Sequence, residues 1–253
     1  SAALLATTAL AQAGGLDRSG LGISPIFETW SYAELSFGLV QPSVDGDLGV
    51  NSGNMAQDYL NYGFAYKADL SDTVSVALMF EQAFGAAVEY QNAAYPLNIA
   101  LGGTLFRAEL PGTALSAVLR HELDGGFSVH GGLRYVTMAG EIDFGNGTQV
   151  ITFGDSSDLG YLLGAAYEIP EIALRASLTY NSATDHNNVI NSTLGVGFPL
   201  GPSAAATGDY SLPQSVNLDF QSGVAEGTLV LASVRWAEWT KTAINTRTAL
   251  GTI

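Results

Sequence analysis

The stretch YSLPQSVNLDFQSGVAEGTLVLASVRWAEWTK, residues 210–241, decides how the rest of the chain is interpreted. Apolar side chains recur at every second position along its two limbs: Tyr210, Leu212, Val216, Leu218 and Phe220, then Val230, Ala232, Val234 and Trp236. Because successive side chains of a strand point to opposite faces of a sheet, this period of two predicts two β-strands. A tight turn is predicted at residues 225–227, where Gly227 can take a positive φ.

Each limb has the length of about ten residues that a tilted strand needs to cross a bilayer. The whole chain is 47% hydrophobic and only 13% charged, with a mean hydropathy of +0.21. No run of about eighteen apolar residues offers a transmembrane helix. An apolar composition without such a run favours a membrane β-barrel, in which only alternate residues are apolar. A large soluble β-sandwich is the alternative, since its strands alternate in the same way.

Several classes of function lack support in the composition. The 253 residues include no Cys, which excludes disulfides and thiolate metal sites, and the net charge of −15 argues against nucleic acid as a partner. We find no nucleophile-elbow sequence, no phosphate-binding loop and no paired-His metal signature. The sequence therefore predicts no enzyme activity, no metal and no cofactor.

The N-terminal region divides into two parts. Residues 1–13, SAALLATTALAQA, form a small apolar run that ends in Ala11-Gln12-Ala13. This pattern is typical of the end of a secretory signal peptide and its cleavage site. Residues 14–31 have no hydrophobic period, and Gly20, Gly22 and Pro25 favour irregular structure there.

From residue 32 the alternation recurs, which predicts about nine strands separated by connections of two kinds. Long connections are predicted near residues 41–57, 84–112, 144–157 and 185–209, and short ones near 70–72, 124–126, 169–171 and 225–227. Outer-membrane barrels have short periplasmic turns and long extracellular loops. The strict alternation therefore predicts a transmembrane antiparallel up-and-down β-barrel with a periplasmic N-terminus. An odd number of strands predicts that residues 32–253 are an incomplete, partial barrel.

Four segments carry a resemblance to a known family. They are LPQSVNLDFQSGVAEGTLVLASVRWAEWT (212–240), HGGLRY (130–135), EIALRASLTYNS (171–182) and GGLDRSGLGIS (14–24). In these segments the chain resembles the FadL/TodX family of outer-membrane transporters of hydrophobic compounds. The resemblance implies a barrel of about fourteen strands in the bacterial outer membrane, closed by an N-terminal hatch. It also implies passive uptake of long-chain fatty acids or similar molecules, by a monomer that outer-membrane lipid and lipopolysaccharide surround.

A fatty acid needs an apolar slot for its chain and a cation for its carboxylate. We predict a hatch formed by residues 14–31, with Leu16, Leu21, Ile23, Pro25, Ile26 and Phe27 as its packing residues. The predicted ligand-binding residues in the lumen are Arg134, Arg235, Arg175, Val136, Met138, Leu162, Leu229, Leu231 and Trp239. Arg134 and Arg235 are preferred because they are expected at similar depth.

Two alternatives stay open from the residues alone. The inward cations can instead pair with inward acids such as Glu34, Glu81, Glu122 and Asp219, as in most barrel interiors. The barrel can also be a general diffusion porin, whose lumen would be filled with water. A soluble structural β-domain is the least favoured function.

Overall fold

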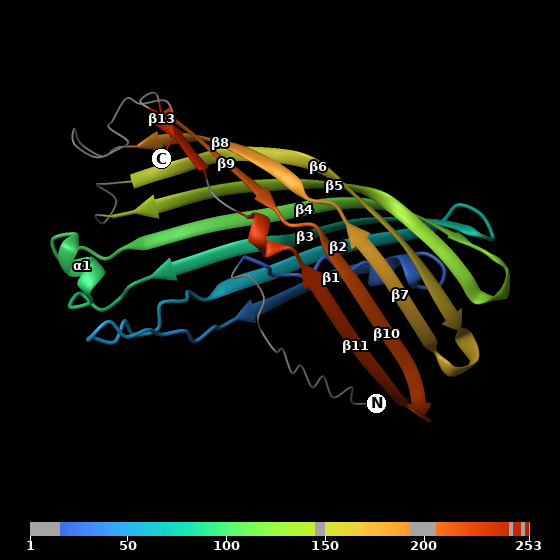
Figure 1. Cartoon of the computed structure of the whole chain (residues 1–253). Helices are drawn as coiled ribbons and strands as arrows, with labels where there is room; N and C mark the ends of the chain where they lie inside the picture. The colour runs from blue at the N-terminus through green and yellow to red at the C-terminus, as the bar shows by residue number, and fades with distance from the viewer. Residues whose placement is uncertain (1–15, 145–149, 193–205, 243–244, 249–250, 253) are drawn as a thin grey trace.

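The computed structural model describes residues 16–144, 150–192, 206–242, 245–248 and 251–252. These residues form one strongly curved antiparallel sheet (Figure 1). The sheet confirms the predicted fold class, an incomplete all-β barrel. Among the described residues, no helix has the length and apolar character required to cross a membrane.

From β1 to β6 the strands follow one another around the sheet in the order of the sequence. The strands are β1 (Tyr32–Val40), β2 (Tyr59–Asp69), β3 (Val74–Glu89), β4 (Arg107–Glu122), β5 (Phe127–Asp143), β6 (Val150–Ile169), β7 (Leu174–Asn181), β8 (Thr184–Ser192), β9 (Ala206–Leu212), β10 (Ser215–Ala225), β11 (Thr228–Ala237), β12 (Asn245–Thr248) and β13 (Gly251–Thr252). The short helices are η1 (Ser24–Phe27), α1 (Pro96–Ala100), η2 (Asp124–Gly126), η3 (Pro170–Ile172) and η4 (Trp239–Lys241).

Three traverses of the sheet are each made of two consecutive strands: β7 with β8, β9 with β10, and β11 with β12. β6 pairs with both β7 and β8, β7 pairs with β10, and β8 pairs with β9. β11 and β12 likewise continue one another beside β10 and β9. The described residues therefore make nine long traverses, which agrees with the predicted number of strands.

The short turns lie where the sequence predicts them, but the strands run further into the long connections. Gly227 has a φ of 69° in the turn between β10 and β11. At the end of the sheet opposite the short turns, β3 extends to Glu89 and β6 begins at Val150. There β8 and β9 also occupy much of the predicted loop 185–209. These loop predictions were wrong for two reasons. The extensions of β6, β8 and β9 carry polar side chains such as Thr152, Asn187 and Asp209 on their outer face, which removes the hydrophobic alternation. In β3 the register shift after Glu81 interrupts the alternation. Residues 193–205 lie outside the described part.

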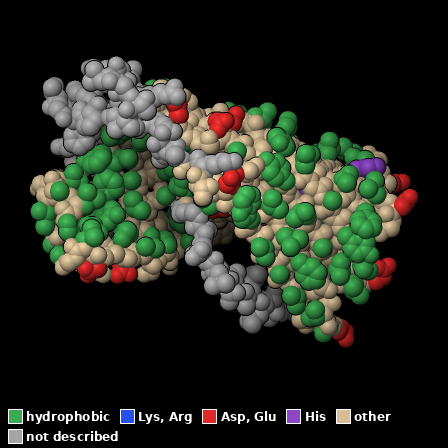
Figure 2. All heavy atoms as spheres, viewed as in Figure 1, with side chains coloured by type: hydrophobic (Ala, Val, Ile, Leu, Met, Phe, Trp, Pro, Cys, Tyr) green, Lys and Arg blue, Asp and Glu red, His purple; other side chains and the backbone are tan. Residues whose placement is uncertain are grey.

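Large apolar side chains cover the convex face of the sheet. Leu35, Phe37, Leu133, Leu218 and Val234 are between 48% and 80% exposed. Figure 2 shows hydrophobic side chains over most of the visible surface of the strands, with acidic ones mainly toward its margins. A contiguous exposed apolar surface of this extent is typical of contact with lipid and is rare on a soluble monomer. The predicted outward faces of the strands are thus confirmed.

Two traverses reverse their inner and outer faces partway along. Ser177, Thr179 and Asn181 of β7 point inward, and after residues 182–183 the inward positions become Thr184, His186 and Asn188 of β8. The neighbouring traverse changes at Pro213: Tyr210 and Leu212 are buried, while Leu218 and Phe220 beyond it are exposed. The prediction that these four share one face was wrong, because Pro213-Gln214 interrupts the strand and alters the alternation.

The N-terminal segment, residues 16–31, lies against the concave face. Ile23, Ile26 and Phe27 are buried, and they pack against inward side chains of β2 to β6. Three of these wall residues are alanines, and the full set is Ala65, Ala77, Met79, Val118, Leu162 and Ala166. The alanines leave width that the segment occupies, so its large residues contribute to the core of the curved sheet.

A β-bulge in β3 joins the N-terminal segment to the wall. The pairing of β3 with β4 shifts register between Glu81 and Phe84. At this place Arg18 N donates to the Ala83 carbonyl at 3.0 Å, and Gly85 N donates to the Leu16 carbonyl at 2.7 Å. A bulge leaves backbone groups without a ladder partner. The N-terminal segment supplies those partners and is held to β3 as a short additional strand.

Candidate functional site

The guanidinium group of Arg134 lies inside the sheet and is bound only by neutral groups of the wall. Its side chain begins on β5, where the residue is 4% exposed. Arg134 Nε donates to Ser116 Oγ at 2.8 Å, and Nη1 donates to Asn181 Oδ1 at 2.6 Å. Its Nη2 has no hydrogen-bond partner among the described residues. An arginine has five donors in a fixed fork, so this group keeps donors for a further acceptor.

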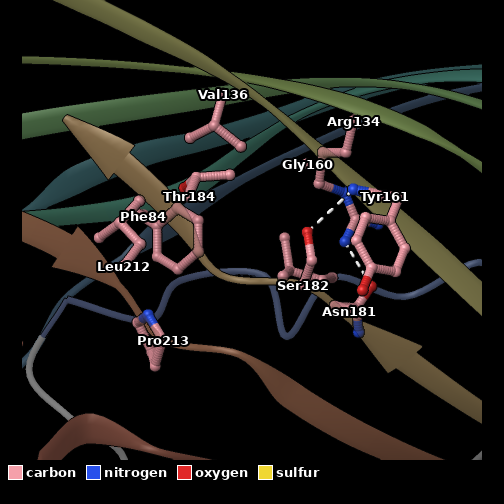
Figure 3. Close-up of a pocket in the computed structure, with 11 residues that line it drawn as sticks. Phe84, Arg134, Val136, Gly160, Tyr161, Asn181, Ser182, Thr184, Leu212 and Pro213 are labelled. Atoms are coloured by element: carbon pink, nitrogen blue, oxygen red, sulfur yellow. Dashed lines mark hydrogen bonds between the residues drawn. The ribbon is translucent and has the colours of Figure 1, made fainter. Parts of the chain in front are cut away.

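The space beside Arg134 is narrow (Figure 3). Phe84, Val136, Thr184 and Leu212 lie together on the side opposite Arg134 and Asn181. Leu21 of the N-terminal segment also lines the space. The cavity measures about 10 Å³, which corresponds to roughly one water molecule. An acyl chain therefore fits beside Arg134 only after neighbouring side chains have moved. Leu21 is one of these neighbours, and it belongs to the N-terminal segment and not to a strand of the wall.

Arg235 of β11 is bound by both the N-terminal segment and the wall. Its Nε forms an ion pair with Asp17 at 2.7 Å, and its Nη1 donates to the Gly20 carbonyl at 3.1 Å. The same Nη1 also approaches Ser215 Oγ and Asn217 Oδ1, at 2.9 and 3.0 Å. The Asp17 and Arg235 side chains are only 8% and 13% exposed. Nη2 of Arg235 has no hydrogen-bond partner among the described residues.

Glu81 connects the two arginines. The carboxylate of this β3 residue interacts electrostatically with Arg134 and Arg235 and accepts a hydrogen bond from Ser19. Asp17 belongs to the same set of interacting charges. Two guanidinium groups and two carboxylates are thus gathered where the N-terminal segment meets the wall. We call Asp17, Ser19, Glu81, Arg134 and Arg235 the charge cluster.

The other end of the N-terminal segment is held by Phe27. Arg120 and Arg175 place their guanidinium groups 4.9 and 4.8 Å from its ring centroid. The ring of His130 meets it edge-on at 5.7 Å. Two cations over one aromatic ring form cation–π contacts on a buried side chain. Phe27 is therefore a second anchor of the segment, separate from the charge cluster.

Of the nine residues predicted to line the lumen, four are buried on the inner face, three are half-buried and two are exposed. Val136, Met138 and Leu162 are between 0% and 2% exposed, and Trp239 packs at the margin of the cluster around Leu21. Arg175 is half-buried and donates to Gln221 Oε1 at 2.8 Å. Leu229 and Leu231 share the face of Arg235 along β11, but they are 49% and 58% exposed at the open edge of the sheet.

The residues predicted for the hatch divide in a similar way. Leu21, Ile23, Ile26 and Phe27 are buried, whereas Leu16 and Pro25 are half-buried. Leu16 nevertheless accepts the backbone hydrogen bond from Gly85. Of the four acids named as alternative partners, Glu122 does pair with an inward cation, Arg120, at 3.2 Å. Arg120 also pairs with Glu168, and Arg235 pairs with Asp17; neither acid was among the four.

Sequence reasoning missed the acidic partner of Arg235 and the amide partner of Arg134. Asp17 lies in a stretch without any periodicity and 218 residues from Arg235, so no local pattern indicates the pair. Asn181 was expected on the inner face of its strand, but its distance from Arg134 depends on the register of β6 against β7. Register between distant strands is a property of the folded sheet and not of one segment.

No family model matches the chain, and no curated protein matches it. Among solved structures, the chain is similar to a FadL homologue of Pseudomonas aeruginosa, with a TM-score of 0.64 and 13% sequence identity. The similarity covers 88% of this chain and 62% of that one. At this identity the likeness concerns the fold, and the chain spans less than two thirds of the matched structure. The sheet with its inner N-terminal segment is therefore an incomplete β-barrel with a FadL-like fold.

Proposed function

We propose that the chain belongs to a barrel for passive uptake of long-chain fatty acids or similar hydrophobic molecules across the bacterial outer membrane. The observation that carries this proposal is the N-terminal segment, which fills the concave side of a sheet whose convex side is apolar. We further propose that residues 14–31 are the hatch, residues 32–253 are part of the barrel wall, and residues 1–13 are the remainder of a signal peptide. Residues 1–15 lie outside the described part.

The arrangement favours this function over a general porin. A porin keeps a water-filled channel lined by polar residues. Here the inward residues next to the hatch include Val118, Val136, Met138 and Leu162, and the space near Arg134 holds about one water molecule. An apolar slot with a few buried cations suits an amphipathic acid better than a small hydrophilic solute. The exposed apolar convex face likewise disfavours a soluble structural β-domain.

In this proposal the short turns face the periplasm and the long connections face the cell exterior. The cargo then reaches the hatch from the cell exterior, through the part of the lumen that contains Met138 and Trp239. Outer-membrane lipid and lipopolysaccharide surround the wall, and the barrel acts as a monomer. No energy input is needed, because a hydrophobic cargo moves down its own gradient between apolar surfaces.

The test compares the intact protein with a variant that lacks residues 14–31, both in planar lipid bilayers and in a fatty-acid binding assay. A plugged transporter binds fatty acid when intact, and ion conductance rises strongly when the hatch is removed. A porin conducts in both forms. The proposal fails if the intact protein conducts ions freely and binds no fatty acid.

A further inference from the structure

The convex face has a depression near the short turns. It measures about 450 Å³ and is bordered on its outer side by Val74, Leu119, His121, Val129, Gly131 and Leu163. Arg120 and His130 also border it, but their side chains form hydrogen bonds on the concave face. Leu119, Val129 and Leu163 are between 45% and 57% exposed. The depression therefore opens on the apolar surface of the sheet and not on the lumen.

Gly131 produces this depression, because it points outward on β5 between Leu119 of β4 and Leu163 of β6. A glycine inside a strand weakens the strand, and it often marks a bulge, a close approach of another backbone or a nearby ligand. The pairing of β5 with both neighbouring strands is regular from Ser128 to Met138. A bulge therefore does not explain Gly131.

The neighbouring Gly132 shows what a close approach of backbone requires. A Cβ atom at Gly132 would collide with the Ala117 carbonyl oxygen, so the backbone of β4 excludes any larger residue there. A Cβ atom at Gly131 would lie 2.9 Å from Leu163 Cδ2 and 3.4 Å from the Leu162 carbonyl oxygen. Leu163 Cδ2 is the end of a flexible side chain and can move. The wall requires glycine at 132 but not at 131, which leaves a nearby ligand as the reason for Gly131.

The depression runs along the strands from the level of the lipid headgroups into the hydrocarbon. His121 lies opposite Val129, two residues from Gly131, a step of about 7 Å along the strand. One further step toward the turns, Phe127 and Tyr167 place their rings 4.8 Å apart on the outer face. Aromatic side chains on the outside of a barrel mark the membrane interface. The long axis of the depression thus has the direction of an acyl chain.

The charges at its turn end indicate the headgroup. His121 is exposed, and an imidazole N–H can donate to a phosphate oxygen. The two neighbouring turns are joined by the hydrogen bond from Glu122 N to the Thr73 carbonyl at 2.7 Å, and they expose Asp72 and Asp124. Residues 70–73 and 122–127 contain no Lys or Arg. Carboxylates at this rim repel a net anionic headgroup and attract an ammonium group.

We propose that the depression at Gly131 binds one acyl chain of an aminophospholipid from the periplasmic leaflet, with its phosphate at His121 and its ammonium group facing Asp72 and Asp124. The inference rests on the membrane location and orientation given under the proposed function, and it is independent of the cargo. It adds a specific lipid site to a wall that lipid otherwise surrounds without preference.

The physical reason is packing. Hydrocarbon surrounds the acyl chain both in the depression and elsewhere in the bilayer, so the hydrophobic effect does not distinguish the two positions. A chain in the depression contacts wall atoms at its floor and on both sides, and the summed dispersion attraction exceeds that of a chain on a convex surface. Headgroup contacts at His121, Asp72 and Asp124 then select the kind of lipid.

The experiment uses the full chain in vesicles of equal parts phosphatidylethanolamine and phosphatidylglycerol. In each sample one of the two lipids carries a photoreactive diazirine midway along one acyl chain. After irradiation, trypsin cuts at Arg120 and Arg134 and releases peptide 121–134, which contains His121, Val129 and Gly131. Peptide 176–235 also faces lipid and contains no residue of the depression. Mass spectrometry measures the label in each peptide.

We expect phosphatidylethanolamine to label peptide 121–134 about fivefold more than phosphatidylglycerol does, the factor that one surface charge contact provides. Both probes should label peptide 176–235 alike. Gly131→Leu fills the depression and should remove the excess label in peptide 121–134. The matched control is Ala117→Leu, which adds the same side chain to an exposed position of β4 that does not border the depression; its labelling should equal that of the unchanged protein.

His121→Ala tests the site without added bulk, because it leaves the depression and removes the phosphate donor; labelling by phosphatidylethanolamine should fall. Equal labelling of peptide 121–134 by both lipids, or an excess that survives in Gly131→Leu, would overturn the lipid site. If the chain does not insert into the vesicles, the proposed membrane function fails. If it inserts and both probes label all lipid-facing peptides alike, the lipid site alone fails.

Discussion

Arg134 and Arg235 are both buried arginines of the inner face, yet they are bound by different parts of the molecule. Arg134 donates to Ser116 and Asn181, which belong to the wall. Arg235 is paired with Asp17 and also donates to Gly20, both in the N-terminal segment. The comparison shows that position on the inner face does not define a role. The partner does: Arg134 is held within the wall, whereas Arg235 links Asp17 of the N-terminal segment to Ser215 of the wall.

The largest effect is expected when the ion pair between Asp17 and Arg235 is broken. Arg235→Ala leaves the Asp17 carboxylate buried without its partner, which costs about 3–5 kcal/mol for a buried pair. The loss should fall on docking of the N-terminal segment and not on the sheet. Hydrogen exchange at the backbone of residues 16–21 should accelerate strongly, while exchange in β4 and β5 stays slow.

Asn187→Ala is the control for this change, because the side-chain hydrogen bond between Asn187 and Asp209 is exposed and involves no residue of the N-terminal segment. It should alter exchange at neither place. Uniform acceleration in all strands of the Arg235 variant would show that Arg235 supports the whole sheet, and the distinction between the two arginines would disappear.

The second anchor should behave independently of the first. Phe27→Ala removes a buried ring from between Arg120 and Arg175, and substitutions of this kind cost about 3 kcal/mol or more. We expect faster exchange at Ile23, Ile26 and their neighbours, with less effect at Leu16. The readout is again hydrogen exchange along residues 16–31.

The control for Phe27 is Phe127→Ala on the convex face. Phe127 is 56% exposed and contacts Tyr167 with ring centroids 4.8 Å apart. Lipid can fill the space that this substitution leaves, so the N-terminal segment should not respond. A double variant of Phe27 and Arg235 should show additive losses if the two anchors share no partner. A strongly non-additive result would mean that the segment undocks as one unit.

Arg134→Ala tests the other side of the comparison and should cost less. It removes hydrogen bonds to two neutral side chains, for which about 1–3 kcal/mol is expected when buried groups lose their partners. The N-terminal segment should stay docked, whereas the affinity for fatty acid measured by calorimetry should fall. If the segment undocks as readily as in the Arg235 variant, Arg134 also holds the N-terminal segment to the wall.

The faces of the strands could be predicted because the bilayer and the lumen demand different side chains at alternate positions. Leu133 and Leu218 were assigned outward and Val136 and Leu162 inward from the alternation alone, and their exposure agrees. The alternation did not extend to β8 and β9, where Asp185, Asn187 and Asp209 point outward beyond the apolar belt. A strand with polar side chains on both faces has the sequence pattern of a loop.

The candidate site was harder to predict than the fold. The arginines could be assigned to the inner face, but the partner that distinguishes them could not. Asp17 reaches Arg235 only because Leu16 and Arg18 pair with the bulge in β3, and that bulge depends on the register shift after Glu81. Each of these steps joins residues far apart in the chain, for which one sequence holds no periodic signal.

The smallest expected effect concerns the narrow space beside Arg134. A methyl group added in Gly160→Ala would lie 2.9 Å from Ser182 Oγ and 3.0 Å from Thr184 Cγ2, both side-chain atoms that can shift. Overpacking then costs about 1 kcal/mol, the low end of its usual range. In Gly164→Ala the methyl group would lie 2.3 Å from the Leu178 carbonyl oxygen, so the backbone must move and the loss should be larger. Thermal unfolding compares the two variants. Because the space belongs to the wall, Gly160→Ala should leave hydrogen exchange at residues 16–21 unchanged; an increase would show that the wall at Arg134 is coupled to the ion pair between Asp17 and Arg235.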